Sequence, residues 1–249
     1  MGQVAVHASR PFAFAMAPVL LTQGARVRRR TPVLPEAGGE RHGVEGAGRD
    51  EPLAVLVFGE STAAGVGVRT QTEGLASALA AGLVQRGGRS VAWRVVARTG
   101  TTARQALVDL VPQMRDASFD VIVVALGVND VLRMRSGRAW QNDLTALIAA
   151  LEHHLRPGGG IILAGVPDLT GFPSLPQPMR ALLALHARHL DRRTARAASN
   201  TQSAVHVSSP RIESHGLFAE DGFHPGAEGY RLWADHLMDA VMSLTHGRG

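Results

Sequence analysis

An aspartate and a histidine stand three residues apart in the stretch DGFHPG, residues 221–226. In a turn, this spacing lets the carboxylate of Asp221 accept a hydrogen bond from Nδ1–H of His224. That bond would fix the imidazole tautomer and leave Nε2 free as a general base. The plainer interpretation is a turn-forming aspartate beside an exposed histidine. If the pair is catalytic, its partners must come from other parts of the chain.

The stretch GESTAAGVGV, residues 59–68, offers a nucleophile. Ser61 would stand at the end of a strand, where backbone N–H groups near a helix start can stabilise negative charge. The alternative is a simple helix N-cap. Two phosphate-binding patterns fail here. The P-loop requires a lysine, of which the chain has none, and a G-x-G-x-x-G pattern starting at Gly65 would end on Thr70.

Two further loops contain candidate donors for an oxyanion. In ARTGTT, Gly100 would let a backbone N–H approach a ligand without a side chain in the way. In GVND, Asn129 follows a very apolar run, and its side-chain NH₂ is a good oxyanion donor. The alternatives are a glycine required by a tight turn, and Asn129 with Asp130 as turn residues that cap the next segment. Each loop alone is ambiguous, but together they supply nucleophile, base, orienting carboxylate and oxyanion donors.

The segments between these loops alternate between strand and helix patterns. Short apolar runs predict five buried strands, at residues 53–59, 91–97, 119–127, 161–167 and 203–209. Helical patterns follow them, at residues 75–86, 102–114, 143–155, 178–199 and 227–245. This alternation predicts a parallel sheet covered by helices on both faces. Ligands bind beyond the carboxyl ends of the strands in such sheets, so the candidate loops should meet at one edge.

With these residues in this order, the chain resembles the SGNH hydrolases, also called GDSL-type esterases and lipases. That family is named for a Ser, a Gly, an Asn and a His in separate blocks, which here are FGEST, ARTGTT, ALGVND and DGFHPG. The resemblance covers about residues 53–245. It implies a flavodoxin-like three-layer α/β/α sandwich, whose centre would be the five-stranded parallel sheet predicted above.

The resemblance also implies an activity and a role for each site residue. It implies a serine esterase that hydrolyses carboxylic esters through an acyl-enzyme on Ser61, with His224 as base and Asp221 as its orienter. The implied oxyanion hole consists of the backbone N–H groups of Ser61 and Gly100 and the side chain of Asn129. No metal and no organic cofactor is expected.

One position departs from the family pattern, and several alternatives stay open. The first block has Glu60 where the family usually has Asp, which moves the carboxylate by about 1.5 Å, one C–C bond. Acyl transfer to an alcohol or a sugar, or cleavage of a thioester, would use the same site. A non-catalytic flavodoxin-like binding module is a further alternative. A metal site at Asp221 and His224 is less favoured, because no other histidine falls at a convincing spacing.

The N-terminal part of the chain differs in composition from the rest. The net charge is +5, all 26 basic residues are arginine, and much of the basic excess lies in residues 1–50. The remainder is nearly neutral, which does not favour a nucleic-acid partner. Residues 31–52 are rich in Gly, Pro and charge. We therefore predict an apolar and basic arm with a linker over residues 1–52, and the hydrolase domain over residues 53–249.

Residues 11–30 combine a short apolar stretch with the arginine-rich RVRRR. The apolar stretch is too short to span a membrane, which takes about 20 residues. An arm packed on the domain is favoured over a secretory signal. Contact with an anionic membrane surface is the alternative. We expect a cytoplasmic protein, either free or membrane-associated, with a small-molecule ester as substrate.

Overall fold

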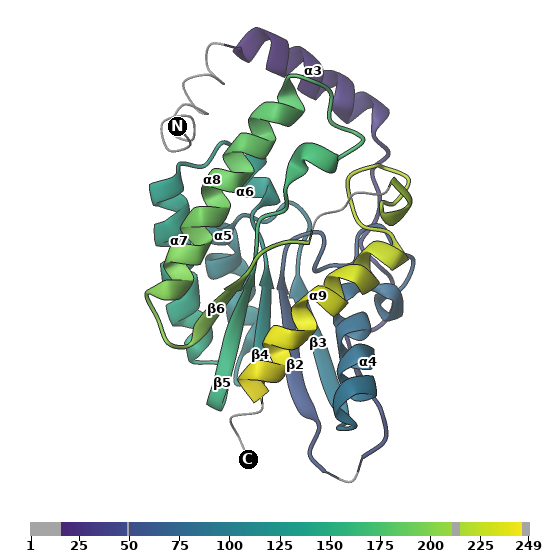
Figure 1. The fold of residues 1–249 in the computed structure, drawn as a ribbon, viewed down its shortest axis with the longest axis vertical. Coiled ribbons are helices and arrows are strands. Elements are labelled where there is room, and N and C mark those ends of the chain that lie inside the picture. Colours follow the sequence, from purple (N-terminus) through teal and green to yellow (C-terminus); the bar gives the residue numbers. More distant parts are fainter. Residues whose placement is uncertain (1–15, 49, 211–214, 246–249) are drawn as a thin grey trace.

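The computed structural model describes residues 16–48, 50–210 and 215–245. At its centre is one sheet with the strand order β1-β3-β2-β4-β5-β6, in which β3-β2-β4-β5-β6 can be followed in Figure 1. The strands are β1 (His42–Glu45), β2 (Leu53–Gly59), β3 (Val91–Ala97), β4 (Phe119–Ala125), β5 (Leu155–Ala164) and β6 (Ala204–Val207). Strands β2 to β6 pair in parallel, and β1 pairs antiparallel with β3.

The order of the parallel strands defines where a ligand can bind. Numbered among themselves along the chain, β2 to β6 have the order 2-1-3-4-5, which is the flavodoxin-like order. The chain leaves β2 toward β3 on one side and returns with β4 on the other. The loops after β2 and β4 therefore diverge and leave a crevice at the carboxyl edge of the sheet. Ser61 and Asn129 follow these two strands.

The sequence correctly predicts an α/β protein with five parallel strands, and the structure adds a sixth, antiparallel strand that the sequence does not predict. The additional strand β1 lies within residues 31–52, which the sequence assigns to a linker. Its four residues, HGVE, include one apolar side chain, so they contain no run that would indicate a strand. Gly43 allows this strand to lie on Trp93, because a Cβ at residue 43 would stand 2.7 Å from a ring carbon.

The residues just before β1 pack on the loop that follows β3. Glu36 accepts a hydrogen bond of 2.6 Å from the N–H of Thr99. Arg41 donates a hydrogen bond of 2.6 Å to the carbonyl oxygen of Ala97. Residues 36–45 therefore lie against the sheet and against the loop that contains Gly100.

Helices cover both faces of the sheet (Figure 1). Helices α4 (Leu75–Gly87) and α9 (Ala227–Thr245) pack together on one face, and α7 (Gly137–Glu152) and α8 (Met179–Ser199) pack together on the other. Every residue of β2 and of β4 is buried. Burial on both faces explains why these strands are apolar runs without a polar alternation, interrupted by Asp120 in β4.

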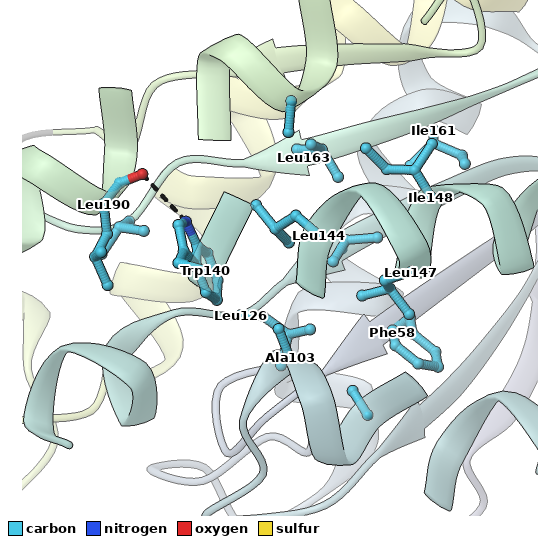
Figure 2. Packing of buried hydrophobic residues seen from close by; sticks show 14 of the residues in the cluster. Phe58, Ala103, Leu126, Trp140, Leu144, Leu147, Ile148, Ile161, Leu163 and Leu190 are labelled. Atoms are coloured by element: carbon cyan, nitrogen blue, oxygen red, sulfur yellow. Dashed lines mark hydrogen bonds between the residues drawn. The ribbon is translucent and has the colours of Figure 1, made fainter. Parts of the chain in front are cut away.

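The core between α7 and α8 also fixes the backbone of the GVND loop. Trp140 is fully buried, and its indole N–H donates to the carbonyl oxygen of Leu190 at 3.1 Å (Figure 2). The same N–H lies 3.0 Å from the hydroxyl of Thr194. Gly127 has φ +133° and lies against this core, since a Cβ there would stand 2.7 Å from Val166 and 3.4 Å from the Trp140 ring. Only glycine fits this position, directly before the loop that contains Asn129.

The helix predicted over residues 102–114 is interrupted. It consists of α5 (Ala103–Gln105), a π-helical turn (Ala106–Leu110) and a 3₁₀ turn (Val111–Met114). Pro112 lacks a backbone N–H and disfavours a regular helix at that point. The remaining short elements are α6 (Val128–Leu132) and the 3₁₀ turns Gln71–Glu73, Leu169–Gly171 and His215–Leu217.

The N-terminal arm forms the helix α3 (Ala17–Arg30), which contains no buried residue. It is attached near the start of α8, where the side chain of Gln23 donates to the carbonyl oxygen of Gln177 at 2.6 Å. The same side chain accepts a hydrogen bond from the N–H of Met179 at 3.2 Å. In the described ranges, no helix combines the length and the apolar character that crossing a bilayer requires.

Candidate active site

Ser61 is separated from the end of β2 by Glu60 alone, and the end of β4 fixes the backbone before it. A Cβ at Gly59 would stand only 2.0 Å from the carbonyl oxygen of Ala125, so a side chain at this position would prevent the approach. That carbonyl oxygen accepts a hydrogen bond of 3.1 Å from the N–H of Glu60. Ser61 is 8% exposed and stands at the carboxyl edge of the sheet, as predicted.

The turn at residues 221–224 brings the predicted aspartate and histidine to this serine. Nδ1 of His224 lies 2.5 Å from Oδ2 of Asp221, and Nε2 of His224 lies 2.9 Å from Oγ of Ser61. The other carboxylate oxygen of Asp221 accepts hydrogen bonds of 2.9 Å from the N–H groups of Phe223 and His224. With Nδ1–H donating to the carboxylate, Nε2 can accept the hydroxyl proton of Ser61.

The carboxyl of Asp221 is held in its ionised form. Burial alone would raise its pKa, but hydrogen bonds from the His224 imidazole and from two backbone N–H groups outweigh burial and lower the pKa below its ordinary value. A carboxyl with a lowered pKa stabilises the fold above its unfolded pKa, and this stability is lost as the pH falls. Asp221 therefore remains an anion opposite the imidazole at neutral pH.

Two contacts hold the histidine turn against the nucleophile loop. Gly67 has φ +105°, and a Cβ there would stand 2.2 Å from the carbonyl oxygen of Pro225. The buried hydroxyl of Tyr230 donates a hydrogen bond of 2.6 Å to the carbonyl oxygen of Val66. Burial, and then the charge of Asp221, raise the pKa of Tyr230, so its hydroxyl stays a donor. No motif in the sequence marks Tyr230, although it is the single tyrosine of the chain.

The carboxylate of Glu60 points away from the triad toward the loop after β4. Its Oε1 accepts a hydrogen bond of 2.8 Å from the N–H of Val128, and its Oε2 accepts one of 3.1 Å from the N–H of Asn129. The side-chain Nδ2 of Asn129 donates to the same Oε2. Burial raises the pKa of Glu60 to about 7 even though these hydrogen bonds favour the ionised form. The sequence marks Glu60 only as a departure from the family pattern.

The predicted oxyanion donors lie on the loops beside Ser61. Nδ2 of Asn129 also lies 3.3 Å from the carbonyl oxygen of Thr101. The carbonyl oxygen of Gly100 accepts a hydrogen bond of 3.1 Å from Arg133. Within the described residues, the backbone N–H groups of Ser61 and Gly100 donate to no protein acceptor. Hydrogen bonds thus join Ser61 to the Asp–His turn, and Asn129 to Glu60, whereas Gly100 is not bonded to the triad.

The neighbouring aspartate of the GVND loop has a structural role. Asp130 is completely buried, and its Oδ2 accepts a hydrogen bond of 3.0 Å from the N–H of Ala103 at the start of α5. The alternative interpretation of this loop, as a cap for the following segment, does not describe Asp130, because α5 precedes it in the chain. It does not describe Asn129 either, whose side chain donates to Glu60.

A pocket opens beside Ser61 and His224 and passes the ends of β4, β5 and β6. Its walls are mostly apolar, and they include Ala125, Leu126, Val128, Ala164, Pro167, Phe172, Phe223 and Trp233. The ring of Phe223 packs edge-on against Phe172 at 5.3 Å and against the His224 imidazole, also at 5.3 Å. The wall therefore comes from several distant segments, which explains why no sequence motif marked it.

These observations define a flavodoxin-like α/β/α protein with a Ser-His-Asp arrangement at the switch point of its sheet. The model of the GDSL-like lipase/acylhydrolase family matches residues 57–232, most of the chain, and the chain belongs to this family.

Proteins from several different sources are similar to this chain. One is the GDSL-like esterase Rv1075c of Mycobacterium tuberculosis (strain ATCC 25618 / H37Rv), 29% identical over 213 residues. The match covers 78% of this chain but only 63% of that protein, so the chain spans less than two thirds of its relative.

Solved structures share the fold. The psychrotrophic esterase EstA from Pseudoalteromonas sp. superposes with a TM-score of 0.59 at 18% identity, over 78% of this chain and 98% of that one. The lipase Lip_vut3 from a goat rumen metagenome gives 0.60 at 16% identity, over 79% of this chain and 99% of that one.

Proposed function

We propose that this protein is a serine esterase that hydrolyses carboxylic esters through an acyl-enzyme on Ser61. The observation that supports this most directly is the hydrogen-bonded series from Asp221 through His224 to Ser61, with 2.9 Å between Nε2 and Oγ. A hydroxyl at this distance from a correctly oriented imidazole is an activated nucleophile. Membership of the GDSL-like lipase/acylhydrolase family supports the same reaction.

The proposed reaction has two steps. In the first, Oγ of Ser61 attacks the ester carbonyl while Nε2 of His224 takes the hydroxyl proton. The imidazolium, stabilised by Asp221, then gives that proton to the leaving alcohol as its C–O bond breaks. In the second step, His224 takes a proton from a water molecule that attacks the acyl-enzyme. Returning the proton to Oγ releases the acid and restores the site.

The negative oxygen of each tetrahedral intermediate needs donors that are already in place. The unpaired N–H groups of Ser61 and Gly100 and the amide of Asn129 are suited to this, in the part of the chain that the structure describes. The amide would exchange its contact of 3.3 Å with Thr101 for the oxyanion. Donors fixed before the reaction cost no reorganisation during it.

Replacing Asn129 with alanine is expected to lower kcat by roughly 10²–10³, the usual effect of losing one oxyanion donor. KM should change little, because the donor acts mainly on the developing charge. Steady-state kinetics on a p-nitrophenyl ester measure both quantities. An unchanged kcat would show that Asn129 is no oxyanion donor.

The pocket supports an uncharged acyl group as the part of the substrate that it binds. Phe172, Phe223 and Ala164 present apolar surface beside Ser61, and burial of such surface favours hydrocarbon over charged groups.

The structurally similar esterase EstA is inhibited by monoethylphosphonate, and we expect a fluorophosphonate to label Ser61 here. A series of p-nitrophenyl esters of increasing chain length, with Ser61→Ala as blank, tests the function. Absence of both labelling and hydrolysis would rule it out.

We also propose that α3 makes the membrane contact that the sequence allows. The helix contains no acidic residue and no buried one, Leu21 is 73% exposed, and Arg28, Arg29 and Arg30 occupy its last turn. A cationic helix with exposed apolar side chains fits an anionic lipid surface.

Replacing the arginines of α3 with glutamine is expected to reduce binding to vesicles that contain phosphatidylglycerol, measured by co-sedimentation. The variant changes Arg26, Arg28, Arg29 and Arg30. A control with the same change in charge replaces Arg188, Arg192, Arg193 and Arg196 of α8 and should bind like the unmodified protein. Equal loss in both variants would mean that net charge, and not α3, determines binding.

A further inference from the structure

The buried carboxylate beside the nucleophile has no part in the proton transfers described above. Glu60 is 2% exposed, and no ion pair links it to an arginine in the described residues. The hydrogen bonds that its carboxylate accepts come from one short segment, the N–H groups of Val128 and Asn129 and the side-chain amide of Asn129. Burying a carboxylate costs free energy unless hydrogen bonds compensate the loss of water, so these three donors are what makes its burial possible.

We propose that Glu60 is a positioning residue that holds the amide of Asn129 in the orientation required of an oxyanion donor. This inference rests on the proposed esterase function, and it concerns the same site. Glu60 itself touches no reacting atom.

The orientation follows from the chemistry of the two groups. A side-chain amide can present either its carbonyl oxygen or its NH₂ group, whereas an ionised carboxylate can only accept hydrogen bonds. Contact with Oε2 of Glu60 therefore selects the NH₂ group of Asn129. The second hydrogen of that group faces the carbonyl oxygen of Thr101, and the distance of 3.3 Å between Nδ2 and this oxygen is longer than in a usual N–H···O bond. This hydrogen is the one that an oxyanion could recruit.

The backbone of Glu60 makes this contact rigid. Its N–H donates to the carbonyl oxygen of Ala125 at the end of β4, at 3.1 Å, and its carbonyl oxygen accepts from Ala64 at 3.0 Å. The side chain thus starts from a fixed point between β2 and β4. Its two oxygens reach two successive backbone N–H groups as well as the amide of Asn129. The same carboxylate consequently fixes both the backbone and the side chain of the donor.

The role requires the ionised carboxylate, so it holds at pH values above the pKa of Glu60. Burial raises the pKa of Glu60 to about 7, and the neighbouring buried carboxyl of Asp130 contributes to this rise. The hydrogen bonds from Val128 and Asn129 oppose it. Each bond therefore stabilises the ionised carboxylate, and the carboxylate in turn holds the donors that the loop presents.

The test replaces Glu60 with glutamine, alone and together with Asn129→Ala. Glutamine has nearly the same shape, but its NH₂ group must face one of the converging N–H donors, so the loop loses an acceptor. We expect kcat to fall about tenfold or more with KM within about twofold. In the Asn129→Ala background the same change should lower kcat by less than about twofold, because the effects of substituting residues that act as one unit are not additive. An unchanged kcat, or additive losses, would overturn the proposal.

A matched control is available at the opposite end of the sheet. Asp120 is also 2% exposed, and it accepts a hydrogen bond of 2.7 Å from the N–H of Ala54. Asp120→Asn removes a buried carboxylate far from Ser61, together with its ion pair to Arg156, and its kcat is expected to stay unchanged. Thermal melts establish that each variant is folded at the assay temperature. A fall in kcat equal to that of Glu60→Gln would assign the effect to general destabilisation.

A second measurement does not depend on catalysis. The side-chain amide signals of Asn129, identified by their loss in Asn129→Ala, are expected to shift in a ¹H–¹⁵N spectrum of Glu60→Gln. Unmoved signals would overturn the positioning role even if the protein hydrolyses no ester, whereas absence of Ser61-dependent hydrolysis alone would refute only the proposed function.

If Glu60→Gln does not fold, Glu60→Asp keeps the charge and shortens the reach by about 1.5 Å. It should shift the same signals and lower kcat several-fold, and no change in either would contradict the proposal.

Discussion

Replacing Ser61 with alanine is expected to lower kcat for ester hydrolysis by about 10⁶, because a triad without its nucleophile retains only binding and oxyanion stabilisation. The structure places the Ser61 hydroxyl 2.9 Å from Nε2 of His224, so its removal leaves the imidazole without the proton that it transfers. Hydrolysis of a p-nitrophenyl ester gives the rate, and the intact mass after treatment with a fluorophosphonate gives the extent of labelling.

Ser77→Ala is the control for this variant. Ser77 is 5% exposed, and its hydroxyl donates to Glu45 at 3.1 Å, away from the Asp–His turn. This variant should keep both the rate and the labelling. A Ser61→Ala protein that retained either one would require a different nucleophile.

Replacing Asp221 with asparagine is expected to lower kcat by about 10⁴, the effect of presenting the histidine in the wrong tautomer. Asp221 accepts hydrogen bonds from Nδ1 of His224 and from two backbone N–H groups. An amide cannot accept all three, and its NH₂ group favours an imidazole with the proton on Nε2. That nitrogen could then no longer take the proton of Ser61.

The chain contains a second aspartate–histidine pair that serves as control for this substitution. Oδ1 of Asp191 lies 2.9 Å from Nε2 of His206 and also accepts a hydrogen bond of 2.9 Å from the N–H of Val166. Asp191→Asn should reduce stability but leave kcat close to that of the unmodified protein. Equal losses of kcat in the two variants would show that disturbance of the fold, and not the tautomer, causes the effect.

That Ser61, Asp221 and His224 lie together could be predicted from the sequence, because the necessary information is local. Asp221 and His224 belong to one turn, and their contact depends on a spacing of three residues. Ser61 and Asn129 each follow a strand of seven buried residues, and such apolar runs are readily detected. Parallel pairing then brings the carboxyl ends of those strands to one edge of the sheet.

Features that depend on distant side chains could not be predicted in the same way. The partners of Glu60 lie 68 and 69 residues further along the chain, and the contact depends on where its carboxylate reaches from β2. Strand β1 was missed because its pairing with β3 depends on Gly43 lying on Trp93, which no local pattern shows. The pocket wall likewise joins Phe172 to Phe223, which are brought together only by the fold.

Strand β1, which the sequence does not predict, forms one outer edge of the sheet. The outermost strands, β1 and β6, have four residues each, whereas the strands between them have seven to ten. An outer strand offers unpaired backbone groups to any neighbouring molecule, and the number of bonds that such a neighbour gains increases with its length. Without β1, the seven residues of β3 would form the outer edge of the sheet on this side. Residues 42–45 therefore shorten the edge on which a neighbouring molecule could extend the sheet.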